Sequence, residues 1–158
     1  MNKSNKSGGF FINRDMYLSD AYLSLSRTAL IILNAFLDAR KRNTQKQAKQ
    51  KSGRRKEPVF INLDSIEMPY DTLVKKYKLN RSSIPRGLDE LMAKGFIKIS
   101  YHGGACKHDK TRYALLDNFL LWLPGMEPFY KRPKKENKGY QGRRLGATAT
   151  DEKISLVK

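Results

Sequence analysis

Tyr70–Gly95, YDTLVKKYKLNRSSIPRGLDELMAKG, is the stretch that decides the fold. It holds two short amphipathic runs joined by a three-residue link, Lys78 to Asn80. Apolar residues share one helical face in each run: Leu73, Val74 and Tyr77 in the first, and Ile84, Leu88, Leu91 and Met92 in the second. Gly95 suits the left-handed position that closes a helix. The sequence therefore predicts two helices joined by a tight turn, a helix-turn-helix.

Upstream, apolar residues at spacings of three and four predict a longer helix over about residues 27–42. Ser24 and Ser26 are both candidates for its N-cap. The alternation of Val59, Ile61 and Leu63 predicts a short strand. Pro69 fits the first turn of the following helix, because a missing N–H has no cost there.

Downstream, residues 97–102 and 111–116 place apolar side chains at alternate positions, which predicts a β-hairpin. Its long tip, residues 103–110, is glycine-containing and basic. The predicted order is helix, strand, helix, turn, helix, hairpin. This order makes the fold mainly α with a small β-sheet, in the α+β class.

Residues 70–116 resemble the winged helix-turn-helix superfamily, and most closely the small DNA-binding proteins of bacterial phages, plasmids and other mobile elements. The resemblance rests on these positions: Leu73, Leu79, Arg81, Ser82, Ser83, Ile84, Arg86, Leu88, Glu90, Leu91, Gly95, Phe96 and Ile97. It implies that the helix over residues 82–94 enters the major groove of DNA. It also implies that the hairpin, the "wing", contacts the DNA backbone or the minor groove.

The exposed side of helix 82–94 carries the candidate DNA-reading residues Arg81, Ser82, Ser83 and Arg86. Arginine can bind guanine through two hydrogen bonds, and hydroxyls can bond phosphates or base edges. The wing adds Lys107, Lys110 and Arg112 as candidate backbone contacts. The alternative interpretation is structural: a solvated helix face with a serine cap, followed by an ordinary basic loop.

Two residues depart from the pattern of the superfamily. Pro85 disfavours helical geometry at Ile84, so we expect the second helix to start at Ser82 or Ser83. Gly87 weakens the first turn of that helix. Either this turn stays malleable until DNA orders it, or Gly87 lets the backbone approach another element closely.

The positive charge is concentrated outside the predicted elements. The 158 residues carry a net charge of +17, and residues 40–57 hold 9 basic and 1 acidic side chains. Residues 131–158 hold 9 basic and 3 acidic side chains. Segments so poor in apolar residues cannot offset their own ordering entropy by burial.

We therefore expect a flexible N-terminus at 1–9, one domain at 10–130 with a basic linker inserted at about 43–57, and a disordered basic tail at 131–158. The expected role of the linker and the tail is contact with phosphates without reading of sequence. The candidate residues for such contacts are Arg54, Arg55, Lys134, Lys135, Arg143 and Arg144.

Other classes of function find little support. The chain has none of the phosphate-binding, nucleophile-elbow or zinc-protease motifs of common enzymes, so we expect no catalysis and no cofactor. His102, Cys106, His108 and Asp109 lack the paired spacing of a zinc site. A single cysteine suits a reducing cytoplasm, and a protein associated with the nucleoid would lie there. The longest apolar run, residues 29–37, is about half of the ~20 residues that a membrane span needs.

Three functions remain open from the sequence. The first is duplex-DNA binding, as a transcriptional regulator or a replication factor of a plasmid or phage. The second is RNA binding within a ribonucleoprotein, although the narrow major groove of A-form RNA excludes a reading helix. The third is a protein-interaction adaptor. The apolar cluster at residues 119–123 is interpreted as core, with the surface of a homodimer or a larger nucleoprotein complex as the alternative.

Overall fold

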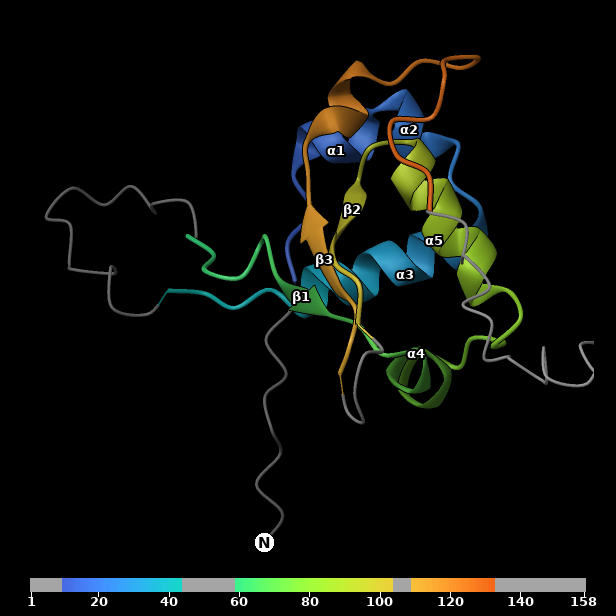
Figure 1. Cartoon of the computed structure of the whole chain (residues 1–158). Coiled ribbons are helices and arrows are strands. Elements are labelled where there is room, and N and C mark those ends of the chain that lie inside the picture. Colours follow the sequence, from blue (N-terminus) through green and yellow to red (C-terminus); the bar gives the residue numbers. More distant parts are fainter. Residues whose placement is uncertain (1–9, 44–58, 104–108, 133–158) are drawn as a thin grey trace, which may run out of the picture.

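The computed structural model describes residues 10–43, 59–103 and 109–132. They form a mixed α+β fold of several helices and one small antiparallel sheet (Figure 1). The elements in chain order are α1 (Arg14–Leu18), α2 (Asp20–Leu23), α3 (Arg27–Asp38), β1 (Ile66–Glu67), α4 (Tyr70–Tyr77), α5 (Ile84–Ala93), β2 (Ile97–Tyr101), β3 (Arg112–Leu115) and the 3-10 helix η1 (Asn118–Leu121). Within the described ranges, no helix is both long and apolar enough to cross a membrane.

Helix α3 is the centre of the core. Ser26 is its N-cap, and the Ser26 hydroxyl accepts a hydrogen bond from the Ala29 N–H at 3.3 Å. The helix ends at Asp38, four residues before the predicted end at Arg42. The side chain of Asn62 explains this early end, because its amide donates to the Ala39 carbonyl at 3.0 Å and its oxygen accepts from the Lys41 N–H at 2.7 Å. These bonds replace a further helical turn.

Helices α4 and α5 confirm the two predicted helices and the turn between them. Pro69 is the N-cap of α4, and Lys78 ends that helix in the left-handed conformation, with φ of 57°. Leu79 in the turn is buried. Helix α5 begins at Ile84, so the predicted start at Ser82 or Ser83 is wrong by one or two residues. Pro85 lies in the first turn, where no intrahelical N–H is needed.

Gly95 closes α5 as predicted, with φ of 79°. The Phe96 N–H donates to the Leu91 carbonyl at 3.0 Å, and the Gly95 N–H donates to the Met92 carbonyl at 3.2 Å. This is the hydrogen-bond pattern of a Schellman motif. It turns the chain directly into β2, and Phe96 stacks on Phe119 with ring centroids 4.8 Å apart.

The sheet has the strand order β1-β3-β2, and both pairings are antiparallel. Strands β2 and β3 confirm the predicted hairpin, whose tip at residues 104–108 lies outside the described residues. The strand predicted at Val59–Leu63 is wrong. In this stretch Phe60 forms only an isolated bridge with Arg42, while Val59 and Ile61 are exposed. On the side of β3 away from β2, the paired strand is β1, in which Ile66 is buried in the core.

The cluster at residues 119–123 is only partly core. Phe119 is buried and Trp122 is half-buried, but Leu120, Leu121 and Leu123 are 54%, 69% and 57% exposed. The core interpretation is therefore wrong for these three leucines. The 3-10 helix η1, which holds the first two of these leucines, lies beside α1 and α2 at one end of the molecule, opposite the end that holds α4 (Figure 1).

Candidate nucleic-acid interface

Helix α5 buries one side and exposes the other, as its apolar stripe predicts. Ile84, Leu88 and Leu91 are fully buried, and the helix packs against α3. Arg86 lies on the exposed side and forms no hydrogen bond or ion pair with another described residue. Its guanidinium is therefore available to a ligand without loss of an internal contact.

Gly87 explains how α5 comes so close to α3. A Cβ at this position would lie 2.8 Å from the Ile32 Cδ1 atom and 3.3 Å from the Ala29 backbone nitrogen. Of the two sequence hypotheses for Gly87, close backbone approach is the one this geometry supports. The glycine therefore belongs to the core packing that orients α5.

In the turn before α5, the serine hydroxyl groups form hydrogen bonds within the turn itself. The Asn80 side-chain oxygen accepts from the Ser82 N–H at 3.1 Å and from the Ser82 hydroxyl at 3.0 Å. The Ser83 hydroxyl donates to the Asn80 carbonyl at 2.8 Å. Both serine protons are thus committed inside the turn, and a phosphate, which only accepts, would have to displace one of these bonds. Ser82 and Ser83 build the turn, whatever else they contact.

Arg81 is partly neutralised by the preceding helix. Its guanidinium lies 2.8 Å from the Asp71 carboxylate in α4, and both side chains are about two-thirds exposed, at 70% and 67%. An ion pair this exposed contributes little stability, roughly 0–1 kcal/mol. A phosphate could therefore replace Asp71 at small cost.

The hairpin residues Lys110 and Arg112 converge on a single acidic side chain. The Lys110 Nζ lies 3.3 Å from one oxygen of Glu67, and the Arg112 Nε lies 3.6 Å from the other. Arg112 also lies over the ring of Tyr101, 5.5 Å from its centroid. Glu67 in β1 thus holds two predicted wing contacts side by side.

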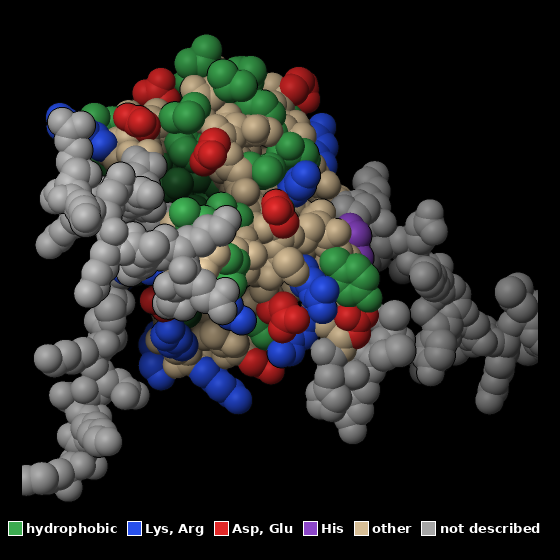
Figure 2. Space-filling view, turned by 90° about the vertical axis from the view of Figure 1, so that its left-hand side faces the viewer, with side chains coloured by type: hydrophobic (Ala, Val, Ile, Leu, Met, Phe, Trp, Pro, Cys, Tyr) green, Lys and Arg blue, Asp and Glu red, His purple; other side chains and the backbone are tan. Residues whose placement is uncertain are grey.

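The predicted residues in the described part of the chain fall at one end of the molecule. Figure 1 places α4, the start of α5 and the tip side of the hairpin together at its lower end. In Figure 2 many lysine and arginine side chains of the face shown lie in its lower half, with several acidic side chains among them. Lys107, Arg54, Arg55, Lys134, Lys135, Arg143 and Arg144 lie outside the described residues.

The sequence prediction missed the lysines of α4. Lys75 and Lys78 are exposed and form no ion pair with a described residue. Lys76 instead donates to Asp38 at 2.7 Å, and this hydrogen bond, with a second from Tyr77, lowers the pKa of Asp38. Lysines in the last turn of a helix complement its dipole, so the sequence did contain a reason to expect lysines there. Their position relative to α5, however, depends on the tertiary fold.

A second missed feature is the course of residues 126–132. The Phe129 N–H donates to the Ala93 carbonyl at 3.0 Å, near the end of α5. Arg132 donates to the Pro85 carbonyl at 3.0 Å and lies 2.9 Å from Asp89, near the start of α5. The chain therefore runs along α5 from its end to its start.

The described residues contain no group of three or more histidine, cysteine, aspartate or glutamate side chains that could hold a metal ion. The arrangement offers exposed cations, among them the guanidinium of Arg86, which forms no hydrogen bond or ion pair within the described residues. Exposed cations of this kind suit the binding of anions. In comparisons with models of protein families, with curated proteins and with solved structures, this chain matches none of them.

Proposed function

We propose that this chain is a non-enzymatic duplex-DNA-binding protein with a winged helix-turn-helix domain. Its role is that of a cytoplasmic, nucleoid-associated transcriptional regulator or a replication factor of a plasmid or phage. The order α3, β1, α4, α5, β2, β3 and the strand order β1-β3-β2 support this reading. In such a domain α5 enters the major groove and the β2–β3 hairpin reaches the flanking backbone.

The observation that carries the proposal is the position of Arg86. It stands near the start of α5 on the side opposite the core, where it is exposed and forms no hydrogen bond or ion pair with any residue that the structure describes. A helix that enters the major groove contacts bases with its N-terminal residues, and arginine binds guanine O6 and N7 through two hydrogen bonds. Arg86 therefore supplies sequence preference.

The other cations supply affinity. Phosphates replace Glu67 as the partner of Lys110 and Arg112, and Asp71 as the partner of Arg81. Each exchange trades an exposed carboxylate for an exposed phosphate, so neither contact depends on sequence. The basic segments at 40–57 and 131–158 add attraction that weakens steeply with salt.

The test is a selection of preferred sites from a random duplex pool, followed by affinity measurements on the selected and a scrambled duplex. Arg86→Ala is expected to reduce the ratio of the two affinities roughly tenfold, the equivalent of one lost bidentate base contact. Arg14→Ala is the matched control, because Arg14 is also exposed and has no ion pair among the described residues, but it lies in α1 at the opposite end.

Three outcomes would contradict the proposal. The first is a selection that yields no preferred duplex, and the second is an Arg86→Ala variant that loses affinity equally on both duplexes. The third is structured RNA that competes as well as the selected duplex at physiological salt, which would favour the RNA-binding alternative. Arg14→Ala should leave the ratio unchanged.

A further inference from the structure

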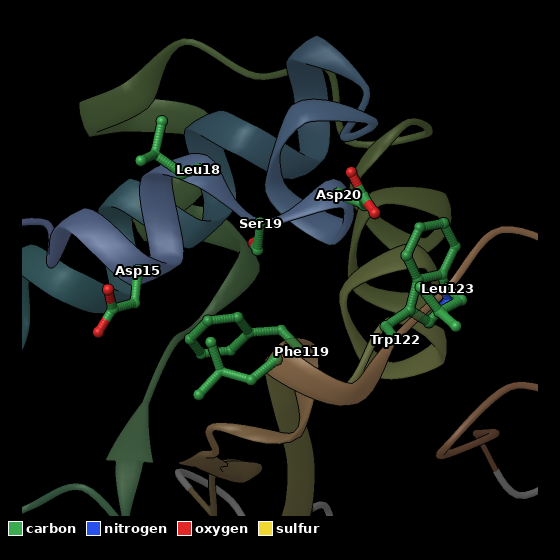
Figure 3. Close-up of a pocket in the computed structure, with 8 residues that line it drawn as sticks. Asp15, Leu18, Ser19, Asp20, Phe119, Trp122 and Leu123 are labelled. Atoms are coloured by element: carbon green, nitrogen blue, oxygen red, sulfur yellow. The ribbon is translucent and has the colours of Figure 1, made fainter.

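A groove lined by both apolar and acidic side chains lies at the end of the molecule away from α4. Its walls come from the junction of α1 and α2 and from η1 with the residues that follow it (Figure 3). It has a volume of about 480 Å³, and its lining residues are Asp15, Leu18, Ser19, Asp20, Phe119, Leu120, Trp122 and Leu123. Figure 2 shows hydrophobic side chains gathered toward the top of the molecule, with acidic side chains among them.

Several large apolar side chains that line this groove are exposed to solvent, and they lie together rather than singly on the surface. Leu18, Leu120 and Leu123 are each more than half exposed, at 56%, 54% and 57%. They meet at one groove with the half-buried ring of Trp122. Contiguous exposed apolar surface of this kind marks a binding site more often than scattered apolar residues do.

The charge of the groove restricts what can bind there. Asp15 and Asp20 line it, both are exposed, and neither forms an ion pair with a described residue. A second copy that docked the same surface face to face would bring four carboxylates together, which disfavours a two-fold pair. The groove suits an apolar segment flanked by cations.

We propose that the groove binds residues 153–158 of its own chain, Lys-Ile-Ser-Leu-Val-Lys. This is the only stretch of residues 133–158 in which three large aliphatic side chains lie within four positions, and a lysine stands at each end of it. Ile154, Leu156 and Val157 match the leucine and tryptophan lining. Lys153 and Lys158 match Asp15 and Asp20.

The length of the connecting chain permits this contact. Arg132 is held at the start of α5, and 20 residues separate it from Lys153. A flexible connection of that length has a root-mean-square span of roughly 25 Å and a maximum near 70 Å. A domain of this size has a radius of gyration of about 14 Å, so the groove is within reach. The tether raises the local concentration of the segment to the millimolar range, and a weak contact then suffices.

Trp122 is the only tryptophan of the chain, and it reports on the groove directly. The experiment measures quenching of its fluorescence by acrylamide, a neutral quencher that the basic segments do not attract. The full chain is compared with a chain that ends at Glu152. We expect an about twofold larger quenching constant in the shortened chain. A capped peptide of residues 153–158, added to it, should lower the constant again in a saturable manner.

Matched variants separate this contact from a general effect of the tail. The peptide with Ile154→Asp and Leu156→Asp should not restore protection. In the full chain, Asp20→Lys should raise quenching to the level of the shortened chain, whereas Asp64→Lys, an exposed carboxylate in the loop before β1, should not. Circular dichroism confirms that each variant is folded.

Equal quenching constants in the full and shortened chains would overturn the proposal. Protection of Trp122 that grows with protein concentration would overturn it too, because the groove would then hold a segment of a second copy. Neither result bears on DNA binding. The proposal about the groove and the proposal about DNA binding are therefore tested by separate measurements.

Discussion

Gly87 shows how one residue sets the position of a helix. In an exposed helix, replacing glycine by alanine stabilises by about 0.5–1 kcal/mol. Here the new Cβ would lie 2.8 Å from the Ile32 Cδ1 atom and 3.1 Å from the Thr28 Cγ2 atom, and Ile32 is fully buried. The steric cost exceeds the gain in propensity, because the neighbours include the backbone of α3.

We therefore expect Gly87→Ala to destabilise the protein by about 1–3 kcal/mol, measured as the midpoint of urea unfolding. Ile32→Val removes the atom closest to the added methyl group, at a cost of about 0.5–1.5 kcal/mol by itself. The double variant should lose less free energy of unfolding than the two single variants lose in sum. Strict additivity would show that the contact with Ile32 does not limit the approach of the two helices.

At the scale of elements, Glu90 ties α5 to the start of α3. Its carboxylate accepts from the Ser26 N–H at 3.0 Å and from Lys94 at 2.9 Å, and Lys94 in turn donates to the Ser24 carbonyl at 2.7 Å. Lys94 is only 9% exposed. Glu90 thus has a structural role, because these bonds fix the orientation of α5 relative to α3.

This carboxylate makes stability depend on pH. Burial alone would raise the pKa of Glu90, but the hydrogen bonds from Ser26 and Lys94 outweigh burial and lower the pKa from its ordinary value of 4.5. Because the folded-state pKa is the lower one, the stabilisation is fully present above about pH 4.5 and is lost as pH falls through the folded-state value.

We expect Glu90→Gln to cost about 1–3 kcal/mol at pH 7, because Lys94 loses its charged partner. The variant should also lose less stability than the natural chain when the pH falls from 6 to 3. Urea midpoints across this pH range measure both effects. Parallel curves for the two proteins would assign the acid sensitivity to other carboxylates such as Asp38, whose pKa is also lowered.

At the scale of the whole molecule, the folded domain and most of the net positive charge belong to different parts of the chain. The described residues carry 16 basic and 11 acidic side chains, whereas the remaining residues carry 16 and 4. Several cations of the domain are already paired with acidic side chains. The folded domain, which we propose recognises the DNA sequence, therefore contributes little long-range attraction for DNA by itself.

A chain that ends at Arg132 lacks 7 basic and 3 acidic side chains. We expect the slope of log affinity against log salt concentration to become shallower by about 3, as for three to four lost phosphate contacts. The ratio of affinities for selected and scrambled duplexes should remain. Filter binding at several salt concentrations measures both. If the affinity ratio were lost and the salt slope stayed unchanged, the tail would supply the sequence preference and the domain the salt-dependent affinity, the reverse of the proposal.

Local patterns predicted most elements because their causes are local. Gly95 ends α5 through a backbone geometry that glycine favours, and the apolar stripe of α5 lies on the buried side as predicted. The hairpin followed from alternation in residues 97–102 and 111–116. The strand predicted at 59–63 failed because alternation alone does not show which edge a strand can pair with, and β3 pairs with Ile66–Glu67 instead.

The sequence by itself determined the α+β class, the two helices α4 and α5 with the turn between them, and the placement of much of the charge outside the helices and strands, since periodicity, helix caps and composition act over short distances. Only the tertiary structure decided the contacts between distant residues. These are Glu67 with Lys110 and Arg112, Gly87 against α3, Arg132 at the start of α5, and the groove beside η1. Such contacts depend on how the helices and the sheet pack around one core, which no local pattern encodes.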